Sequence, residues 1–310
     1  MATKPIVVVG SVNLDLVCRC QRMPSPGETV SGASFQMFEG GKGANQAVAV
    51  ARLGHPVSMV AKVGDDEFGV RLRNALQAAG VCVDAVSIAN GVSSGVAAIT
   101  TDRQGQNSIV VVPGANGRLL PSDLDNAAPM LRSAGMVLTQ LEIPIETVHY
   151  LARLAKKFGV PLMLDPSPAQ PLRPPFLRDI AYLTPNETEA SSLCGGNGQV
   201  IDPSNAHLFA EKLLESGPRN IIIKMGKQGS YLAGPEDRGH FVPAFKVRAL
   251  DSTAAGDAFN GGLAVALMQG SKLAKAARFA AAVAAISVRR KGAQPSMPTA
   301  EQVNSFLKSI

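Results

Sequence analysis

The stretch Asp251–Gly262 of this chain has the composition of a tight turn that leads into a helix. Small residues precede Asp257, and an apolar segment follows it. The first N–H groups of such a helix lack intrahelical partners and carry the positive end of its dipole, so Ala254, Ala255 and Gly256 predict an anion site. Asp257 is either the cap of this helix or an acid held beside a bound phosphate, and spacing alone favours the cap.

A second glycine-rich stretch, Gly40–Gly54, also predicts a turn that opens a helix, with Gly54 as the stop. Its Gly-Lys pair is followed by Gly43 and not by Ser or Thr, which excludes a Walker A phosphate loop. The chain contains no G-x-G-x-x-G sequence either, which argues against a dinucleotide-binding dehydrogenase.

Together, the two stretches resemble motifs of the ribokinase family of carbohydrate kinases. They read G-G-K-G-A-N from Gly40 and D-S-T-A-A-G-D from Asp251, with Ser252 where the family usually has Thr. Three further segments are similar to the family's motifs and lie in the same order along the chain: Asn13–Asp15, Thr184–Glu189 and Lys291–Ser296. The resemblance covers nearly the whole chain.

The pattern of apolar runs predicts an α/β fold. Strand and helix patterns alternate, which is typical of a mostly parallel central sheet between helices, a three-layer αβα sandwich. Two β excursions interrupt this alternation and predict a small β-sheet lid, formed by insertions at about residues 15–37 and 94–112 of one domain, 1–310. The resemblance implies the same lid and a homodimer contact through it.

Composition narrows the class of protein. Apolar residues make up 46% of the 310 residues, enough for a sizeable core, and the formal net charge of +6 is modest for this length. Basic residues are not interleaved with aromatic ones, which argues against nucleic-acid binding. No apolar run is long enough to span a bilayer and no signal peptide is visible. The four cysteines fit neither a zinc site nor a redox pair, so we expect reduced thiols in a cytoplasmic protein.

Polar residues follow the predicted strands. Asn13 and Asp15 come where a strand end meets a loop, and side chains two apart on an extended segment share a face, so they suit one small polyol. The alternative for Asn13 and Asp15 is an ordinary loop pair, and the alternative for Glu142 is an acid on the surface. The resemblance implies a sugar site made of Asn13, Leu14, Asp15, Gly41, Lys42, Gly43, Ala44, Asn45, Glu142 and Asp257.

Phosphoryl transfer needs a base, donors for the developing phosphate charge, a metal and exclusion of water. Asp257 would be the base, and the amides of 254–257 would form the anion hole. Asn186 and Glu189 are either helix-start residues or, as the resemblance implies, hold Mg²⁺ through water. The resemblance implies a nucleotide site made of Asn186, Lys224, Met225, Gly226, Lys227, Gln228, Gly229, Gly256 and Asp257. Lys224 and Lys227 depart from the family's usual residues there.

The resemblance also implies an activating K⁺ between two loops. Carbonyl oxygens at a helix exit lack intrahelical partners, and with one carboxylate they suit a weakly charged cation, although such oxygens usually bond water. The implied ligands are Asp251, Thr253, Ser287, Arg290, Gly292 and Ser296.

The implied function is ATP-dependent phosphorylation of D-ribose at its 5-hydroxyl, giving ribose 5-phosphate and ADP. Alternatives are a deoxyribokinase, fructokinase or nucleoside kinase of the same superfamily, and a non-catalytic sensor on the same fold. The Asn13–Asp15 segment together with the Gly41–Asn45 motif favours ribose, and a sensor has no need of the base Asp257. Ala281 replaces a His or Asn that often borders the adenine in relatives, which leaves the nucleotide preference open.

Overall fold

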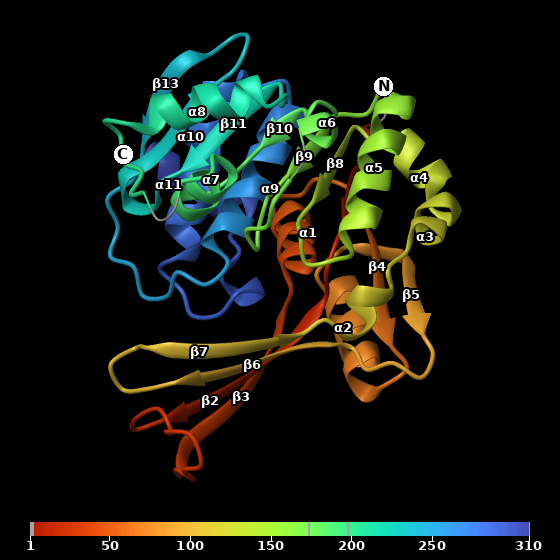
Figure 1. Ribbon diagram of the computed structural model, residues 1–310, viewed down its shortest axis with the longest axis vertical. Helices are drawn as coiled ribbons and strands as arrows, with labels where there is room; N and C mark the ends of the chain where they lie inside the picture. Colours follow the sequence, from red (N-terminus) through yellow and green to blue (C-terminus); the bar gives the residue numbers. More distant parts are fainter. Residues whose placement is uncertain (1–2, 173, 197–198, 310) are drawn as a thin grey trace.

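The computed structural model describes residues 3–172, 174–196 and 199–309, which contain two β-sheets (Figure 1). The larger sheet has nine strands in the order β13-β12-β11-β10-β9-β8-β1-β4-β5, and its pairs are parallel except for those that β12 makes with β11 and β13. The strands are β1 Ile6–Val9, β4 Val57–Gly64, β5 Cys82–Ala89, β8 Met136–Thr139, β9 Leu162–Leu164, β10 Tyr182–Leu183, β11 Asn220–Lys224, β12 Gly229–Ala233 and β13 Arg238–Pro243.

Helices cover both faces of this sheet, so the predicted three-layer αβα architecture is confirmed (Figure 1). One face carries α1 Lys42–Arg52, α2 Glu67–Ala78, α9 Ala255–Met268, α10 Leu273–Ser287 and α11 Ala300–Lys308. The other face carries α3 Pro121–Asn126, α4 Ala128–Ser133, α5 Ile145–Phe158, α6 Pro174–Leu177, α7 Glu187–Leu193 and α8 Ala206–Glu215. Among the residues described, no helix is both long and apolar enough to cross a membrane.

The core is divided by the sheet, and strand alternation decides which residue joins which half. Ile6 and Val8 of β1 pack with α1 and α9, whereas Val7 and Val9 pack with the helices of the opposite face. Because both faces are covered, all four residues are fully buried, which is why the strand reads as a continuous apolar run.

The second sheet, called here the small sheet, has four strands in the order β3-β2-β6-β7 and projects from the larger one (Figure 1). Its strands are β2 Asn13–Cys20, β3 Gly32–Gly40, β6 Gly95–Thr101 and β7 Asn107–Val112. Asn13 and Asp15 lie on an extended segment as expected, because both belong to β2, and the alternative of an ordinary loop pair was wrong. Asn13 pairs with Gly40 on one side and Gly95 on the other, and these long-range ladders extend the strand back to that residue.

Glycines let the first helix approach the sheet closely. A Cβ on Gly43 would lie 2.7 Å from the backbone nitrogen of Ser11, and one on Gly261 of α9 would lie 2.6 Å from the Cβ of Ala49. Side chains at these two positions would force α1 away from β1 and from α9. The two glycine-rich stretches of the sequence therefore meet in space because α1 packs directly on α9. Three short 3₁₀ helices, η1 Gly114–Arg118, η2 Gly226–Gln228 and η3 Gln294–Ser296, complete the described elements.

Candidate active site

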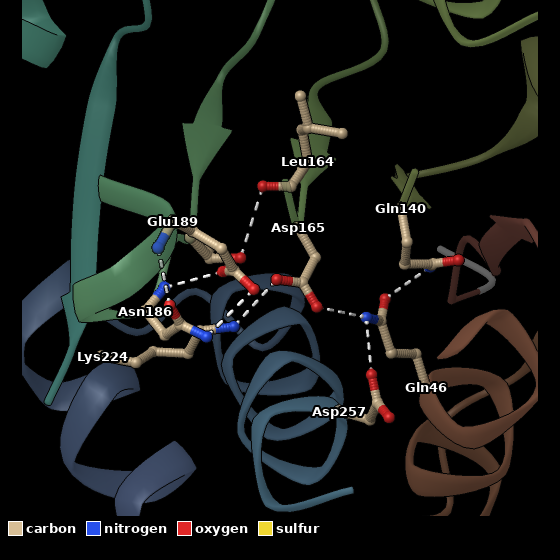
Figure 2. Close-up of polar contacts among 9 residues, drawn as sticks. Gln46, Gln140, Leu164, Asp165, Asn186, Glu189, Lys224 and Asp257 are labelled. Carbon is tan, nitrogen blue, oxygen red and sulfur yellow. Dashed lines mark hydrogen bonds and ion pairs between the residues drawn. The ribbon is translucent and has the colours of Figure 1, made fainter. Parts of the chain in front are cut away.

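Polar side chains gather at the carboxyl edge of the larger sheet, where parallel strands end. Gln140 follows β8, Asp165 follows β9 and Lys224 is the last residue of β11. Figure 2 shows these side chains converging on Gln46 of α1 and Asp257 of α9. Ligands of open α/β sheets bind at this edge, so the arrangement marks the candidate site.

Asp257 is the third residue of α9 and is almost completely buried, with 4% of its surface exposed. Its carboxylate accepts hydrogen bonds from Asn45 Nδ2 at 3.0 Å and from Gln46 Nε2 at 3.1 Å. Burial raises the pKa of Asp257 to about 6, with Asp165 adding to the rise and Lys42 and the two amides opposing it. A carboxyl group with a pKa close to neutrality is well suited to general-base catalysis.

The start of α9 has the geometry of an anion site. Ala254 is its N-cap residue and has a left-handed backbone, with φ of 59°, the one positive φ of a non-glycine residue in the described part of the chain. No side chain caps the helix, and in particular Asp257 lies inside it and does not act as its cap. The N–H of Ala255 donates to the carbonyl oxygen of Ser252 at 3.2 Å, so the N–H groups of Gly256 and Asp257 are those left to a ligand, with Gly256 providing unobstructed access to the backbone.

Two carboxylates, those of Asp15 and Glu142, lie near Asp257 on its other side. Burial raises the pKa of Asp15 to about 7, and the nearby charges of Glu142 and Asp257 raise it further. Glu142 accepts hydrogen bonds from Ser11 Oγ at 2.5 Å and from the backbone N–H of Lys42 at 3.1 Å. Clustered acceptors of this kind suit a ligand that carries several hydroxyl donors.

The remaining members of this cluster are Asn13 and Lys42. The side chain of Asn13 is buried on β2, where its Oδ1 accepts a hydrogen bond of 2.6 Å from Asn116 Nδ2, so its amide orientation is fixed. Burial lowers the pKa of Lys42, but the carboxylates of Asp257, Asp165, Glu142 and Glu189 outweigh this and raise it overall. Lys42 therefore stays charged among these acids.

A cavity of about 410 Å³ lies beside the start of α9. Its wall is largely apolar, with Phe245, Val247 and Val288 on one part and Ala281, Ala284 and Ala285 of α10 on another. Lys224, Gly226 and Gly256 also line it, and Gly256 belongs to the anion site. An apolar cavity that is also lined by cations and free N–H groups fits a purine base with its phosphates directed at those groups.

Comparison with known proteins matches residues 3–300 to the family described as pfkB family carbohydrate kinase. The chain belongs to the pfkB family of carbohydrate kinases. It is 43% identical to a ribokinase of Bacillus subtilis over 97% of this chain and 99% of that one. It is 39% identical to a deoxyribokinase of Salmonella typhi, over 97% of this chain and 98% of the relative. The structure resembles that of Arabidopsis thaliana ribokinase complexed with ribose and ATP, with a TM-score of 0.92, 36% identity and 99% coverage of both chains.

In this pfkB-family kinase the predicted sugar-site residues lie close together, but not all of their side chains face the site. Asn13, Asp15, Asn45, Glu142 and Asp257 surround one region, as the preceding contacts describe. Leu14 lies between two of them but packs in the core, because alternation along β2 turns its side chain to the opposite face. Ala44 is likewise fully buried, so only the backbones of these two residues remain for a ligand.

The predicted nucleotide residues are spread over two places. Lys224, Gly226, Lys227, Gly229 and Gly256 line the 410 Å³ cavity. Met225 and Gln228 instead help to line a neighbouring cavity of about 710 Å³ beside α7.

Asn186 and Glu189 form a capping box at the start of α7. Asn186 Oδ1 accepts from the N–H of Glu189 at 2.8 Å, and a Glu189 oxygen accepts from the N–H of Asn186 at 2.8 Å. This is the helix-start chemistry that the spacing alone favoured.

Several residues of the site were not predicted from the sequence. Ser11, Gln46, Asn116 and Asp165 contact predicted residues, and Gln140 contacts Gln46. Their positions in the sequence could have identified some of them, since Gln140 and Asp165 come directly after buried strands and Gln46 lies one residue beyond Asn45. Polar residues at strand ends are the group from which α/β proteins take their ligand contacts.

Proposed function

We propose that this kinase transfers the γ-phosphoryl group of ATP to the 5-hydroxyl of D-ribose, giving ribose 5-phosphate and ADP. The observation that carries the proposal is the position of Asp257, whose buried carboxylate lies between a cluster of acceptors for a polyol and a helix start suited to phosphate. The ribokinase relatives, one of them complexed with ribose and ATP, support the choice of sugar and nucleotide.

The sugar would be held by hydrogen bonds to fixed acceptors. Hydroxyl groups of ribose donate to the carboxylates of Asp15 and Glu142, and Asn13 offers an amide whose orientation Asn116 sets. Glu142 is itself fixed by Ser11 and by the start of α1. Acceptors that are already positioned lose little entropy when the substrate binds, which favours both affinity and orientation.

Asp257 would remove the proton of the attacking hydroxyl. In its ionised form it is stabilised by the amides of Asn45 and Gln46, which also hold it in place. The oxygen then bonds to the γ-phosphorus as the bond to the bridging oxygen breaks, and the electron pair leaves with ADP. The N–H groups of Gly256 and Asp257 would stabilise the negative charge on the transferring group.

Asn186 and Glu189 fit a role in holding Mg²⁺. Their hard oxygen atoms suit Mg²⁺, and the described residues contain no group of three His, Cys, Asp or Glu that would enclose a metal by itself. Mg²⁺ commonly keeps its waters and is bound through one or two carboxylates and substrate phosphates, so these two residues would hold it through water. The ion would neutralise charge on the ATP phosphates.

The loops predicted to bind K⁺ lie side by side. The carboxylate of Asp251 accepts from the N–H of Thr253 and from the N–H of Gly292, both at 2.9 Å, and so joins the turn before α9 to the loop after α10. The carbonyl oxygen of Val288 accepts from the N–H of Asp251 at 3.1 Å. We assign main-chain oxygens of these two loops as ligands of K⁺, together with those near Ser287, Arg290 and Ser296. The ion would fix the backbone that leads into the anion site.

The small sheet is proposed as a lid over the sugar and as the contact of a homodimer, within one domain spanning 1–310. Ile109, Val110, Val111 and Val112 of β7 are 47–62% exposed. Consecutive strand residues point to opposite faces, so this apolar surface lies on both faces of the sheet. One face would cover the sugar and the other would pack on a second copy, as exposed apolar strands require cover.

We place this activity in the cytoplasm, where ATP is available. The four cysteines, Cys18, Cys20, Cys82 and Cys194, are free thiols, which suits a reducing compartment.

A coupled assay of ADP release against a panel of pentoses, hexoses and nucleosides tests the proposal. Ribose should give the highest kcat/KM. The second candidate is a deoxyribokinase, because one relative of that name is nearly as similar as the ribokinases. Equal or higher kcat/KM for 2-deoxyribose would favour that candidate, and no turnover with any sugar would reject both.

A further inference from the structure

Lys224 and Asp165 form a buried ion pair that continues to the proposed base. Lys224 Nζ lies 2.9 Å from Asp165 Oδ1, and the side chains are 13% and 3% exposed. The other oxygen of Asp165 accepts from Gln46 Nε2 at 3.2 Å, and the same Nε2 donates to Asp257 Oδ1 at 3.1 Å. Gln140 Nε2 donates to Gln46 Oε1 at 2.7 Å, which fixes the orientation of the Gln46 amide. Asp165 thus lies between Lys224 and Gln46 (Figure 2).

The ammonium group of Lys224 is placed at the start of α9. A Cβ built on Gly256 would lie 3.5 Å from Lys224 Nζ. A positive charge at the positive end of a helix is unfavourable on its own, because the free N–H groups and the ammonium repel each other. The same lysine lines the 410 Å³ cavity. A cation, free N–H groups and an open cavity at one point form a site for a group with more than one negative charge.

We propose that Lys224 binds the phosphoryl group that is transferred, and that Asp165 is a positioning residue that holds the ammonium at the start of α9 and away from Asp257. This inference rests on the proposed function. The ammonium keeps its proton throughout. It neutralises charge on the oxygens of the γ-phosphate as the sugar oxygen bonds to phosphorus and the bridging oxygen leaves with ADP. Asp257 alone takes up the hydroxyl proton.

The position of Gln46 links Asp165 to the proposed base, Asp257. The two hydrogens of its Nε2 are divided between Asp165 and Asp257, so two buried carboxylates share one donor group. The charge of Lys224 also reaches the carboxylate of Glu187 on α7. If Asp165 lost its charge, Asp257 would lose a neighbouring negative charge and its pKa would fall, because the charge of Asp165 raises that pKa.

Lys224→Met tests the first part of the proposal. We expect kcat with ribose and ATP to fall by about 10²-fold or more, the size of effect seen when one donor to a transition-state charge is removed. The ribose KM should stay within about twofold, because the proposal assigns the lysine to the phosphoryl group and not to the sugar. Calorimetry should show affinity for ATP falling by about tenfold, and more than affinity for ADP, because a charge-assisted bond to the γ-phosphate is lost.

Asp165→Asn tests the second part. We expect kcat to fall by roughly tenfold and the acid limb of the kcat/KM profile to move to lower pH, which a purely structural role would not produce. The double variant Asp165→Asn with Lys224→Met removes both charges and avoids an unpaired buried carboxylate, so it should recover stability while kcat stays low. Lys62→Met is the matched control, because Lys62 forms an ion pair of 2.7 Å with Asp123 that is similarly buried and belongs to other elements. It should change the melting temperature and leave kcat unchanged.

The outcomes separate this inference from the proposed function. If the wild type phosphorylates ribose and folded Lys224→Met keeps kcat within about threefold, the role of Lys224 is overturned. An unmoved acid limb in Asp165→Asn would overturn the role of Asp165. If the wild type phosphorylates no sugar, the proposed function fails, and the affinities decide the inference: equal losses for ATP and ADP would reject a contact with the γ-phosphate.

Discussion

Replacing Asp257 by asparagine should remove catalysis while leaving the protein at least as stable as the wild type. Asparagine has the same shape but cannot take up the hydroxyl proton, so turnover should fall by about 10²–10⁴-fold, the contribution of a general base. The ribose KM should change little, since the acceptors Asp15 and Glu142 remain. A residue that served only to start α9 would show the opposite pattern, with lost stability and retained turnover.

The expected gain in stability follows from the burial of Asp257. Its pKa rises from 3.8 to about 6 on folding, so the folded state disfavours the ionised form. Above pH 6 this costs about 3 kcal/mol of unfolding free energy, a cost that asparagine does not carry. Losing one acceptor would cost about 1–3 kcal/mol. However, the Oδ1 of Asn45 is buried without a partner, so a rotated Asn45 amide can accept from the new side chain. We expect a net gain of about 1–3 kcal/mol.

The pH dependence of this gain is the sharper test. Relative to the variant, the wild type has its highest unfolding free energy below pH 3.8, where Asp257 is protonated in both the folded and the unfolded state. This relative stability is lost as pH rises through about 6. Urea unfolding at several pH values should show an advantage of Asp257→Asn that grows up to about pH 6–7 and then levels off.

Asp66→Asn is the control of opposite sign. Burial alone would raise the pKa of Asp66, but hydrogen bonds from Ser94 and Gly69 lower it overall, so its charge stabilises the fold. Turnover of Asp257→Asn within about threefold of wild type would refute the role as base, and a loss of stability at every pH would refute the burial argument.

Three further expectations concern the sugar, the lid and K⁺. Asp15→Ala should raise the ribose KM by roughly tenfold or more, because a charged partner of a hydroxyl is lost, and an unchanged KM would exclude the contact. Ribose should slow hydrogen exchange in β2, β3, β6 and β7 if the small sheet closes over it, and no change in any of these strands would exclude a ligand-gated lid. K⁺ should raise kcat above that in tetramethylammonium buffer, and Asp251→Ala should abolish the difference; equal rates in K⁺-free protein would count against the site.

Elements with a strong local pattern could be predicted from the sequence. The residue pattern predicts a helix over 145–158 and a hairpin over 95–101 and 107–112, and both have those bounds in the structure. It also predicts a strand over 29–35, which instead runs from Gly32 to Gly40 because its length is set by pairing with β2. Strands β5 and β12 were not predicted. The apolar residues of β5 are interrupted by polar ones at its exposed positions, and β12 lies directly after a glycine-containing turn.

The candidate site was predictable where residues belong to a motif and not where they meet only in space. Asn45 and Asp257 were predicted from their own stretches, and their hydrogen bond joins residues 212 positions apart. Nothing local shows that Gln46 would bridge Asp257 and Asp165, which is 119 positions away. Lys224 was recognised as a departure from the family's usual residue, but its partner could not be found from spacing, since a strand-end acid has many possible neighbours. Packing of α1 on α9 creates these contacts, and that packing depends on the whole sheet.

Asp15 and Asp257 share an electrostatic property that links substrate binding to chemistry. Burial raises the pKa of both, to about 7 and about 6, and the charge of Asp257 adds to the rise at Asp15. Hydroxyl donors of a sugar bound at Asp15 would stabilise its ionised form and so lower its pKa. By linkage, the proposed sugar site predicts tighter binding to the ionised protein and an affinity that weakens as pH falls below about 7. The phosphate side has the opposite character, with Lys224 and the start of α9 held close together. Asp257 is therefore the one acid of the site that faces both a polyol and an anion, which is the position that transfer of a phosphoryl group to a hydroxyl requires.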